Sequence, residues 1–152
     1  MQIVKVEKGS ENAAALLEFV RHFSWVDVQE HMTEKLEAWD FTDWEAAFAA
    51  KDGEKIVGMA YLLKTDYYPL PEIFPWVTCL FVSEEVRGRG LCGQLIDCAN
   101  RYAASLGFAR TYIPTEHTGV FEKYGYRFLR EITNYGGGVD RLLAKELKGE
   151  QA

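Results

Sequence analysis

The chain has 152 residues, with 17 Lys and Arg against 23 Asp and Glu, for a formal net charge of −6. Hydrophobic residues make up 48% and charged residues 26%, a balance typical of globular proteins rather than disordered ones. A chain of this length can bury a core without a disulfide or metal, so we expect one domain over residues 1–152. The acidic excess argues against bulk electrostatic binding of nucleic acid.

The N-terminal segment and the cysteines favour a cytoplasmic location. Residues 1–8 lack the apolar core of a signal peptide, and no apolar run is long enough to cross a bilayer, so we expect no membrane partner. Cys79, Cys92 and Cys98 form no CxxC pair, and their odd number indicates free thiols. The three histidines lack metal-ligand spacing, so we expect no metal site.

Apolar periodicity predicts the elements of the first half of the chain. We expect a strand over residues 2–7, a helix over 10–23 capped by Ser10, and a helix over 28–39. Apolar runs on both sides of Asp52-Gly53 predict a hairpin with both turn residues at positive φ. Residues 66–75 hold three of the four prolines and are expected to form a loop.

The second half continues the alternation of strands and helices. We expect a strand over 76–82, a helix over 90–106, a strand over 108–113, a short helix over 118–124, and strands over 126–133 and 139–147. The order β-α-α-β-β-β-α-β-α-β-β predicts a mixed α/β domain.

Residues 87–93, Arg-Gly-Arg-Gly-Leu-Cys-Gly, lie between a buried strand and a long helix. Glycines let a ligand approach the backbone closely. The first turn of a helix has unpaired N–H groups and a partial positive charge. The segment therefore predicts a cradle for a phosphate or diphosphate, with added positive charge from Arg87 and Arg89.

The glycine segment also has other possible interpretations. No G-x-x-x-x-G-K-[ST] motif is present, which excludes a P-loop nucleotide site. Gly88, Gly90 and Gly93 match G-x-G-x-x-G, but the roughly 60 residues that follow leave no room for the βαβ units of a dinucleotide fold. A plain glycine turn before a helix is the structural alternative.

Two blocks of sequence resemble the GNAT acetyltransferase superfamily. Arg87-Gly88-Arg89-Gly90-Leu91-Cys92 is similar to its [RQ]-x-x-G-x-[GA] signature, with Cys92 where Gly or Ala is usual. The block 119–126 is similar to its L-Y-E-K-x-G-F motif. The resemblance covers about residues 44–147. It implies one mixed, mostly antiparallel twisted sheet flanked by helices, and often a homodimer, which apolar residues in the last hairpin also favour.

The resemblance also implies the cofactor and the reaction. The glycine segment would hold the diphosphate of coenzyme A, and the strand before it would pair with the pantetheine arm of acetyl-CoA. An N–H group of that strand would face the thioester carbonyl. A primary amine would attack acetyl-CoA directly, so Cys79 and Cys92 need not be nucleophiles. The cofactor-binding residues implied are Leu80, Phe81, Val82, Arg87, Gly88, Arg89, Gly90, Leu91, Cys92, Gly93 and Phe121.

The proposed catalytic residues depart from the family pattern. Phe121 stands where the family often has the Tyr that protonates the leaving thiolate. Tyr124, three residues on, is our candidate acid, and His117 is a candidate cofactor contact or proton relay. Glu72 is our candidate base. Each of the three has a structural alternative. Tyr124 could serve only packing, His117 could cap a helix, and Glu72 could be a solvated loop carboxylate.

The acceptor side is expected to be aromatic and acidic. Trp25, Tyr67 and Trp76 are our candidate substrate-binding residues, and nearby carboxylates would attract a cation. A small-molecule or peptide amine is the expected acceptor. Two functions stay open. One is an acetyl-CoA-dependent N-acetyltransferase. The other is a non-catalytic acyl-CoA sensor or scaffold of the same fold, which stays possible because Phe121 has no proton to donate.

Overall fold

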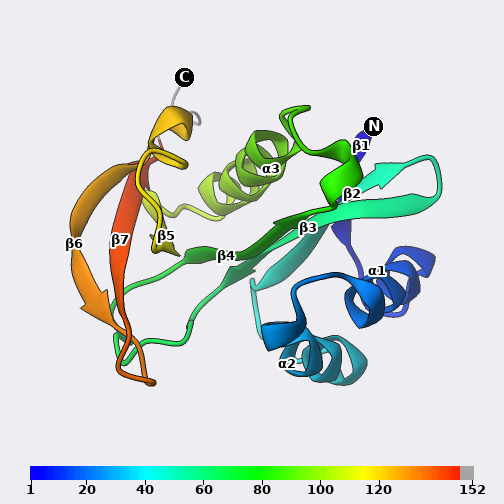
Figure 1. Ribbon diagram of the computed structural model, residues 1–152, viewed down its shortest axis with the longest axis horizontal. Coiled ribbons are helices and arrows are strands. Elements are labelled where there is room, and N and C mark those ends of the chain that lie inside the picture. The colour runs from blue at the N-terminus through cyan, green and yellow to red at the C-terminus, as the bar shows by residue number, and fades with distance from the viewer. Residues whose placement is uncertain (148–152) are drawn as a thin grey trace.

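One seven-stranded sheet organises the computed structural model, which describes residues 1–147 (Figure 1). The strand order is β1-β2-β3-β4-β5-β7-β6, and every neighbouring pair is antiparallel except β4 and β5. The predicted mixed, mostly antiparallel sheet flanked by helices is therefore confirmed. The strands are β1 (Gln2–Val6), β2 (Ala46–Asp52), β3 (Lys55–Leu63), β4 (Trp76–Val82), β5 (Arg110–Thr115), β6 (Arg127–Thr133) and β7 (Val139–Glu146).

Helices cover both faces of the sheet. They are α1 (Glu11–His22), α2 (Val26–Ala38) and α3 (Leu91–Ser105), with short 3₁₀ turns η1 (Glu84–Val86) and η2 (Glu122–Tyr124). Figure 1 shows α3 on one face and α1 and α2 on the other. Along β2, Phe48 packs in the α3-side core, whereas Ala47 and Ala49 pack in the core beneath α1 and α2. Because both faces are covered, β2 and β3 carry nearly unbroken apolar runs.

Several local predictions agree with the structure. Ser10 caps α1, since its hydroxyl oxygen accepts from the Ala13 N–H at 3.1 Å. Gly107 follows α3 with φ of 96°, and the helix closes with a bond from the Phe108 N–H to the Ala103 carbonyl. Because Phe108 takes part in this helix end, β5 begins at Arg110, two residues later than predicted.

Two predicted elements differ from the structure. The predicted helix over 118–124 is wrong: only η2 forms, because Gly119 adopts φ of 88° and interrupts a helical start. The hairpin between β2 and β3 is confirmed, but its turn is Gly53-Glu54, and of these two only Gly53 has positive φ (66°). A turn with glycine in its first central position needs one positive φ, not two.

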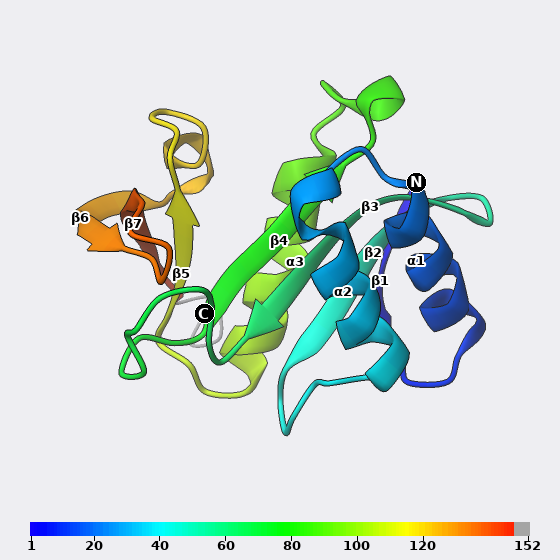
Figure 2. The same cartoon turned by 60° about the horizontal axis from the view of Figure 1, so that its bottom comes forward.

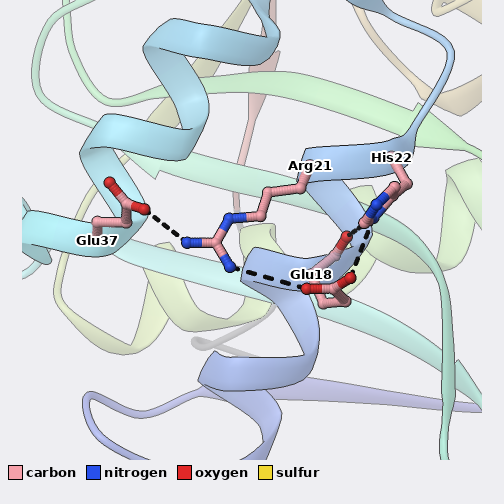
Figure 3. A network of polar contacts seen from close by, with 4 residues as sticks. All are labelled: Glu18, Arg21, His22 and Glu37. Atoms are coloured by element: carbon pink, nitrogen blue, oxygen red, sulfur yellow. Dashed lines mark hydrogen bonds and ion pairs between the residues drawn. The ribbon is translucent and has the colours of Figure 1, made fainter.

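Charged side chains join α1 to α2 on the surface (Figure 3). The Arg21 guanidinium lies 2.6 Å from the Glu37 carboxylate of α2 and 3.7 Å from Glu18 of α1, and His22 Nδ1 lies 3.1 Å from Glu18. All four side chains are exposed, so each pair contributes at most about 1 kcal/mol. The two helices are held mainly by their apolar side chains, such as Leu16 and Met32.

Some apolar side chains remain exposed near the last hairpin. Phe128, Tyr135 and Val139, of β6, the following turn and β7, are 46%, 64% and 58% exposed. The expected homodimer stays a prediction. Among residues 1–147, no helix has the length and apolar character needed to cross a membrane. No cluster of potential metal ligands occurs in the same residues.

A buried polar triad anchors β5 to α3. The Thr111 hydroxyl of β5 donates to Asn100 Oδ1 of α3 at 2.7 Å and lies 2.7 Å from the Tyr126 hydroxyl just before β6. The Asn100 amide nitrogen also bonds the Tyr126 hydroxyl at 3.2 Å. All three residues are buried, so each polar atom depends on the other two for hydrogen bonding.

We expect Thr111→Val to destabilise the fold by about 1–3 kcal/mol, because it leaves buried partners without the hydroxyl. Denaturant unfolding measures this change. Thr133→Val, at an exposed position of β6, is the matched control and should change the free energy of unfolding by about 0.5 kcal/mol or less. Equal effects of the two substitutions would contradict a structural role for the triad.

Candidate functional site

The parallel strands β4 and β5 separate almost as soon as they meet. Trp76 and Tyr112 are the one residue pair that joins them in the described structure, supported by a bond from the Tyr112 N–H to the Pro75 carbonyl. Figure 2 shows β5 diverging from β4 beyond this point. The β4 edge from Val77 to Val82 is therefore unpaired on the side that faces β5, while its other edge pairs with β3.

A β-bulge lies in the diverging part of β4. The register with β3 passes from Thr78 opposite Tyr61 to Phe81 opposite Met59, so Cys79 and Leu80 share one partner position. Cys79 has φ of 54°, which is unusual for a residue other than glycine. Bulges redirect the backbone and are frequent beside functional sites. This one turns both Thr78 and Cys79 away from α3, since Val77 and Leu80 pack in the α3-side core.

The glycine segment forms an exposed turn with unpaired N–H groups. Gly88 and Gly90 adopt φ of 85° and 79°, and Gly90 caps α3 without a side-chain bond. The first intrahelical bond goes from the Gln94 N–H to the Gly90 carbonyl. Within residues 1–147, the N–H groups of residues 88–93 have no hydrogen-bond acceptor. Six adjacent donors at a helix start are the kind of group that binds an anion, and the anion cradle stays a prediction.

The two arginines of the segment lie differently from each other. Arg87 turns back onto β4, where its Nε donates to the Val82 carbonyl at 2.7 Å and its guanidinium lies 5.5 Å from the centre of the Phe81 ring. Arg89 is exposed, and no ion pair involves it in the described part of the chain. The exposed Arg89 adds a positive charge to this turn, whereas the Arg87 side chain is bonded to the end of β4.

The second motif block meets the glycine segment through Tyr124. A Cβ atom added at Gly93 in the first turn of α3 would lie 2.7 Å from Tyr124 Cε1, so the tyrosine ring occupies the space that glycine leaves. Lys145 of β7 holds this tyrosine by donating to its carbonyl at 2.9 Å. Phe121 packs against the α3-side core beside it. The structure therefore brings Tyr124, Phe121 and the helix start together.

His117 lies in the loop that follows β5. The ion pair of Glu122 and Arg141 holds this loop in place. The loop's Gly119 N–H donates to Glu122 Oε1 at 2.8 Å, and Glu122 pairs with Arg141 of β7 at 3.2 Å. Arg141 also donates to the His117 carbonyl at 2.8 Å. The His117 N–H donates to the Thr115 hydroxyl, while the imidazole is exposed. The residue caps the end of β5 through its backbone, and its side chain bonds to no other group within residues 1–147.

The other proposed residues do not form one group, and only Trp25 packs with α1 and α2. Trp25 lies at the start of α2, stacked at 6.4 Å on Phe81 of β4. Tyr67 is exposed and packs on Tyr135, 5.6 Å between ring centres. Trp76 is 1% exposed and lies behind Tyr68, so it supports a wall rather than presenting one. Glu72 is an exposed loop residue.

Sequence reasoning missed a polar group beside the bulge. The Thr78 hydroxyl donates to Asp66 Oδ2 at 2.6 Å, and the Tyr67 N–H donates to Asp66 Oδ1 at 2.8 Å. Burial raises the pKa of Asp66 above its ordinary value, against the opposing effect of these two bonds. Next to it, the Tyr68 hydroxyl donates to Asp140 of β7 at 2.6 Å. The one available signal was Thr78, a hydroxyl within an otherwise apolar strand.

The thiols near the site are not activated. Burial raises the pKa of Cys79 to about 12 and also raises the pKa of Cys92 in the first turn of α3. The thiolate is the nucleophilic form, so both residues remain protonated near neutral pH. This agrees with the interpretation of these cysteines as small packing residues.

The chain is similar to a known protein family and to several solved structures. The model of the Acetyltransferase (GNAT) family matches residues 13–126. An aminoglycoside 6'-acetyltransferase type Ii has 20% identity and a TM-score of 0.74, over 97% of this chain and 98% of that one. An aminoglycoside 6'-N-acetyltransferase complexed with coenzyme A has 18% identity and a TM-score of 0.73, over the same shares. An acetyl-CoA-bound GNAT acetyltransferase from Elizabethkingia anophelis has 17% identity and a TM-score of 0.63, over 96% and 97%.

At these identities the structural likeness establishes the fold alone. No curated protein sequence matches the chain. The family model covers well over half of the chain and includes the unpaired β4 edge, the glycine turn and η2. The chain therefore belongs to the Acetyltransferase (GNAT) family.

Proposed function

We propose that this protein is an acetyl-CoA-dependent N-acetyltransferase in which a primary amine attacks the thioester directly. The observation on which this rests is the row of free N–H groups at residues 88–93, next to the unpaired edge of β4. The first feature suits a diphosphate and the second suits an extended amide-containing chain, and coenzyme A contains both in one molecule. Two structural relatives were solved with coenzyme A or acetyl-CoA, which supports the assignment.

The residues that hold the carrier follow from this arrangement. The backbone of residues 88–93 binds the diphosphate, with Arg89 as the nearby cation, and Leu80 to Val82 pair with the pantetheine arm. Phe121 and Leu91 supply apolar contacts next to the helix start. Arg87 stays a proposed cofactor-binding residue, and its side chain also fixes the end of β4.

The proposed reaction forms a C–N bond and breaks a C–S bond. The neutral amine attacks the acetyl carbon, an unpaired β4 N–H stabilises the developing oxyanion, and coenzyme A leaves as its thiolate. Tyr124 is the proposed proton donor to that sulfur, because it lies three residues after Phe121, which stands at the usual position of the family's tyrosine. His117 and Glu72 remain further candidates for proton transfer, and both side chains are exposed.

The acceptor and the setting are also part of the proposal. Trp25 stacks on Phe81 of β4, Tyr67 is exposed, and Trp76 is buried behind Tyr68. These three remain the proposed substrate-binding residues, and a small-molecule or peptide amine is the proposed acceptor. Three free cysteines support a cytoplasmic location. A non-catalytic acyl-CoA sensor is the second candidate, because Phe121 has no proton to donate.

Thiol release from acetyl-CoA separates the two functions. We expect release above background with at least one member of a panel of amines, together with formation of the N-acetyl product. Heat on titration with coenzyme A but no thiol release with any amine would favour the sensor. The absence of heat on titration with coenzyme A would contradict both proposed functions.

We expect Gly88→Ala to weaken coenzyme A binding about tenfold, measured by calorimetry. A side chain at φ of 85° costs about 1–2 kcal/mol, which the loop relieves by moving its N–H groups. Gly53→Ala is the matched control, since Gly53 also has positive φ (66°) and an added Cβ meets no atom within 4 Å at either position. It should lower stability without changing affinity. Unchanged affinity in Gly88→Ala would count against the cradle.

We expect Tyr124→Phe to lower kcat by about 10²-fold while KM for acetyl-CoA is unchanged. The substitution removes the hydroxyl and keeps the ring that fills the space above Gly93. Steady-state kinetics across pH measures the effect, with coenzyme A affinity as the control for the site's integrity. A rate equal to wild type at every pH would exclude Tyr124 as the acid.

A further inference from the structure

We infer that Asp66 takes the proton from the acceptor amine and that Thr78 positions its carboxylate. This inference rests on the proposed N-acetyltransferase function and deepens it by naming a group at the acceptor side that the sequence did not indicate. Asp66 lies in the loop between β3 and β4, twelve residues before its partner Thr78.

Hydrogen bonds hold the carboxylate of Asp66 in place but do not use all of its acceptor capacity. Each oxygen accepts one hydrogen bond, Oδ2 from the Thr78 hydroxyl and Oδ1 from the Tyr67 N–H. A carboxylate oxygen can accept two, so each retains capacity for an amine proton. The residue is neither fully buried nor fully exposed. Fixing of this kind orients a proton acceptor before the substrate arrives.

Asp66 lies beside the part of β4 where we expect the reacting acyl group. Its partner Thr78 immediately precedes Cys79, the residue of the bulge, in the part of β4 that has left β5. A pantetheine arm that starts at the glycine turn and runs back along β4 brings its acyl end toward this bulge. Thr78 and Cys79 face away from α3, so an amine beside Asp66 approaches from the side of α1 and α2.

Neighbouring buried groups extend the polar surroundings of this point. The Tyr61 hydroxyl, directly across the β3–β4 ladder from Thr78, is fully buried and has no partner among the described residues. The Trp76 indole N–H, two residues before Thr78, is buried and likewise unpartnered there. A buried polar group without a partner is costly and calls for an explanation, of which a role in binding or catalysis is one.

The charges around Asp66 come from three elements. His31 of α2 lowers its pKa, Asp140 of β7 raises it, and Tyr68 and Cys79 are the other titratable groups close to it. Burial is the largest influence and raises the pKa. An alkylammonium has a pKa near 10, so a carboxylate with a raised pKa is a better proton acceptor than a solvated one. Glu72, on the same loop, is exposed and lacks such an environment.

The proton balance of the step is complete. The bound R–NH₃⁺ gives one proton to the Asp66 carboxylate, and the lone pair of R–NH₂ forms the C–N bond. The C–S bond breaks, Tyr124 gives its proton to the sulfur, and the nitrogen loses a second proton to water, from which Tyr124 is reprotonated. The products are the N-acetyl amine and the thiol of coenzyme A, and protonated Asp66 then releases its proton to water.

The test compares four variants by thiol release across pH, using an amine that the wild type acetylates. We expect Asp66→Asn to lower kcat about 10²- to 10⁴-fold and to remove the acidic limb of the pH profile. Thr78→Val should move that limb to higher pH, because the lost hydrogen bond normally lowers the pKa of Asp66. Asp52→Asn, in the exposed β2–β3 hairpin, is the matched control and should behave as wild type. Glu72→Gln tests the rival carboxylate.

Misfolding could also lower the activity of a variant, so coenzyme A affinity and melting temperature are measured as controls. Both should stay near the wild-type values in Asp66→Asn. Activity of Asp66→Asn equal to wild type, or loss of the acidic limb in Glu72→Gln alone, would overturn the inference and leave the proposed function intact. An unmoved limb in Thr78→Val would overturn the positioning role. Absence of thiol release by the wild type with any amine would instead refute the proposed function itself.

Discussion

The separation of β4 from β5 is the constraint on which the rest of this molecule depends. A central strand normally satisfies its backbone groups on both edges, and leaving one edge unpaired has a cost that only a ligand or water can offset. Here a parallel pair is joined at one position and then diverges, so the interior of the sheet contains an edge. A chain with amide groups can add to that edge as a further strand, which makes the sheet itself a recognition surface.

Several features keep the two strands apart. The bulge at Cys79, with its left-handed backbone, bends β4 away from the regular ladder. On the other side, the buried triad of Asn100, Thr111 and Tyr126 fixes β5 to α3, so β5 cannot slide back toward β4. Apolar packing on both faces supplies the stability that compensates for the open edge. The strained backbone thus lies where the proposed chemistry takes place, as is common in active sites.

Local patterns were sufficient to predict most elements and the glycine turn, because apolar spacing, caps and turn residues act over a few positions. The elements that differed, such as the segment around Gly119, depend on backbone angles that a residue type permits but does not dictate. The pairing of Asp66 with Thr78 and the packing of Tyr124 on Gly93 join residues distant in sequence, and a bulge changes which side chains share a face. Periodicity assumes an unbroken ladder, so it could not place these contacts.

The thermodynamics of Asp66 bear on why such a group exists in this loop. Its pKa is higher in the folded protein than in the unfolded chain, so the folded state holds the proton more tightly between those two pKa values. Stability therefore falls as pH rises through that interval, and above it the ionised carboxylate stays less favourable folded than unfolded. A carboxylate that only served the fold would show the opposite sign, as paired surface carboxylates do. The hydrogen bonds from Thr78 and Tyr67 limit this cost without removing it, which is the balance expected of a group held ready to exchange a proton.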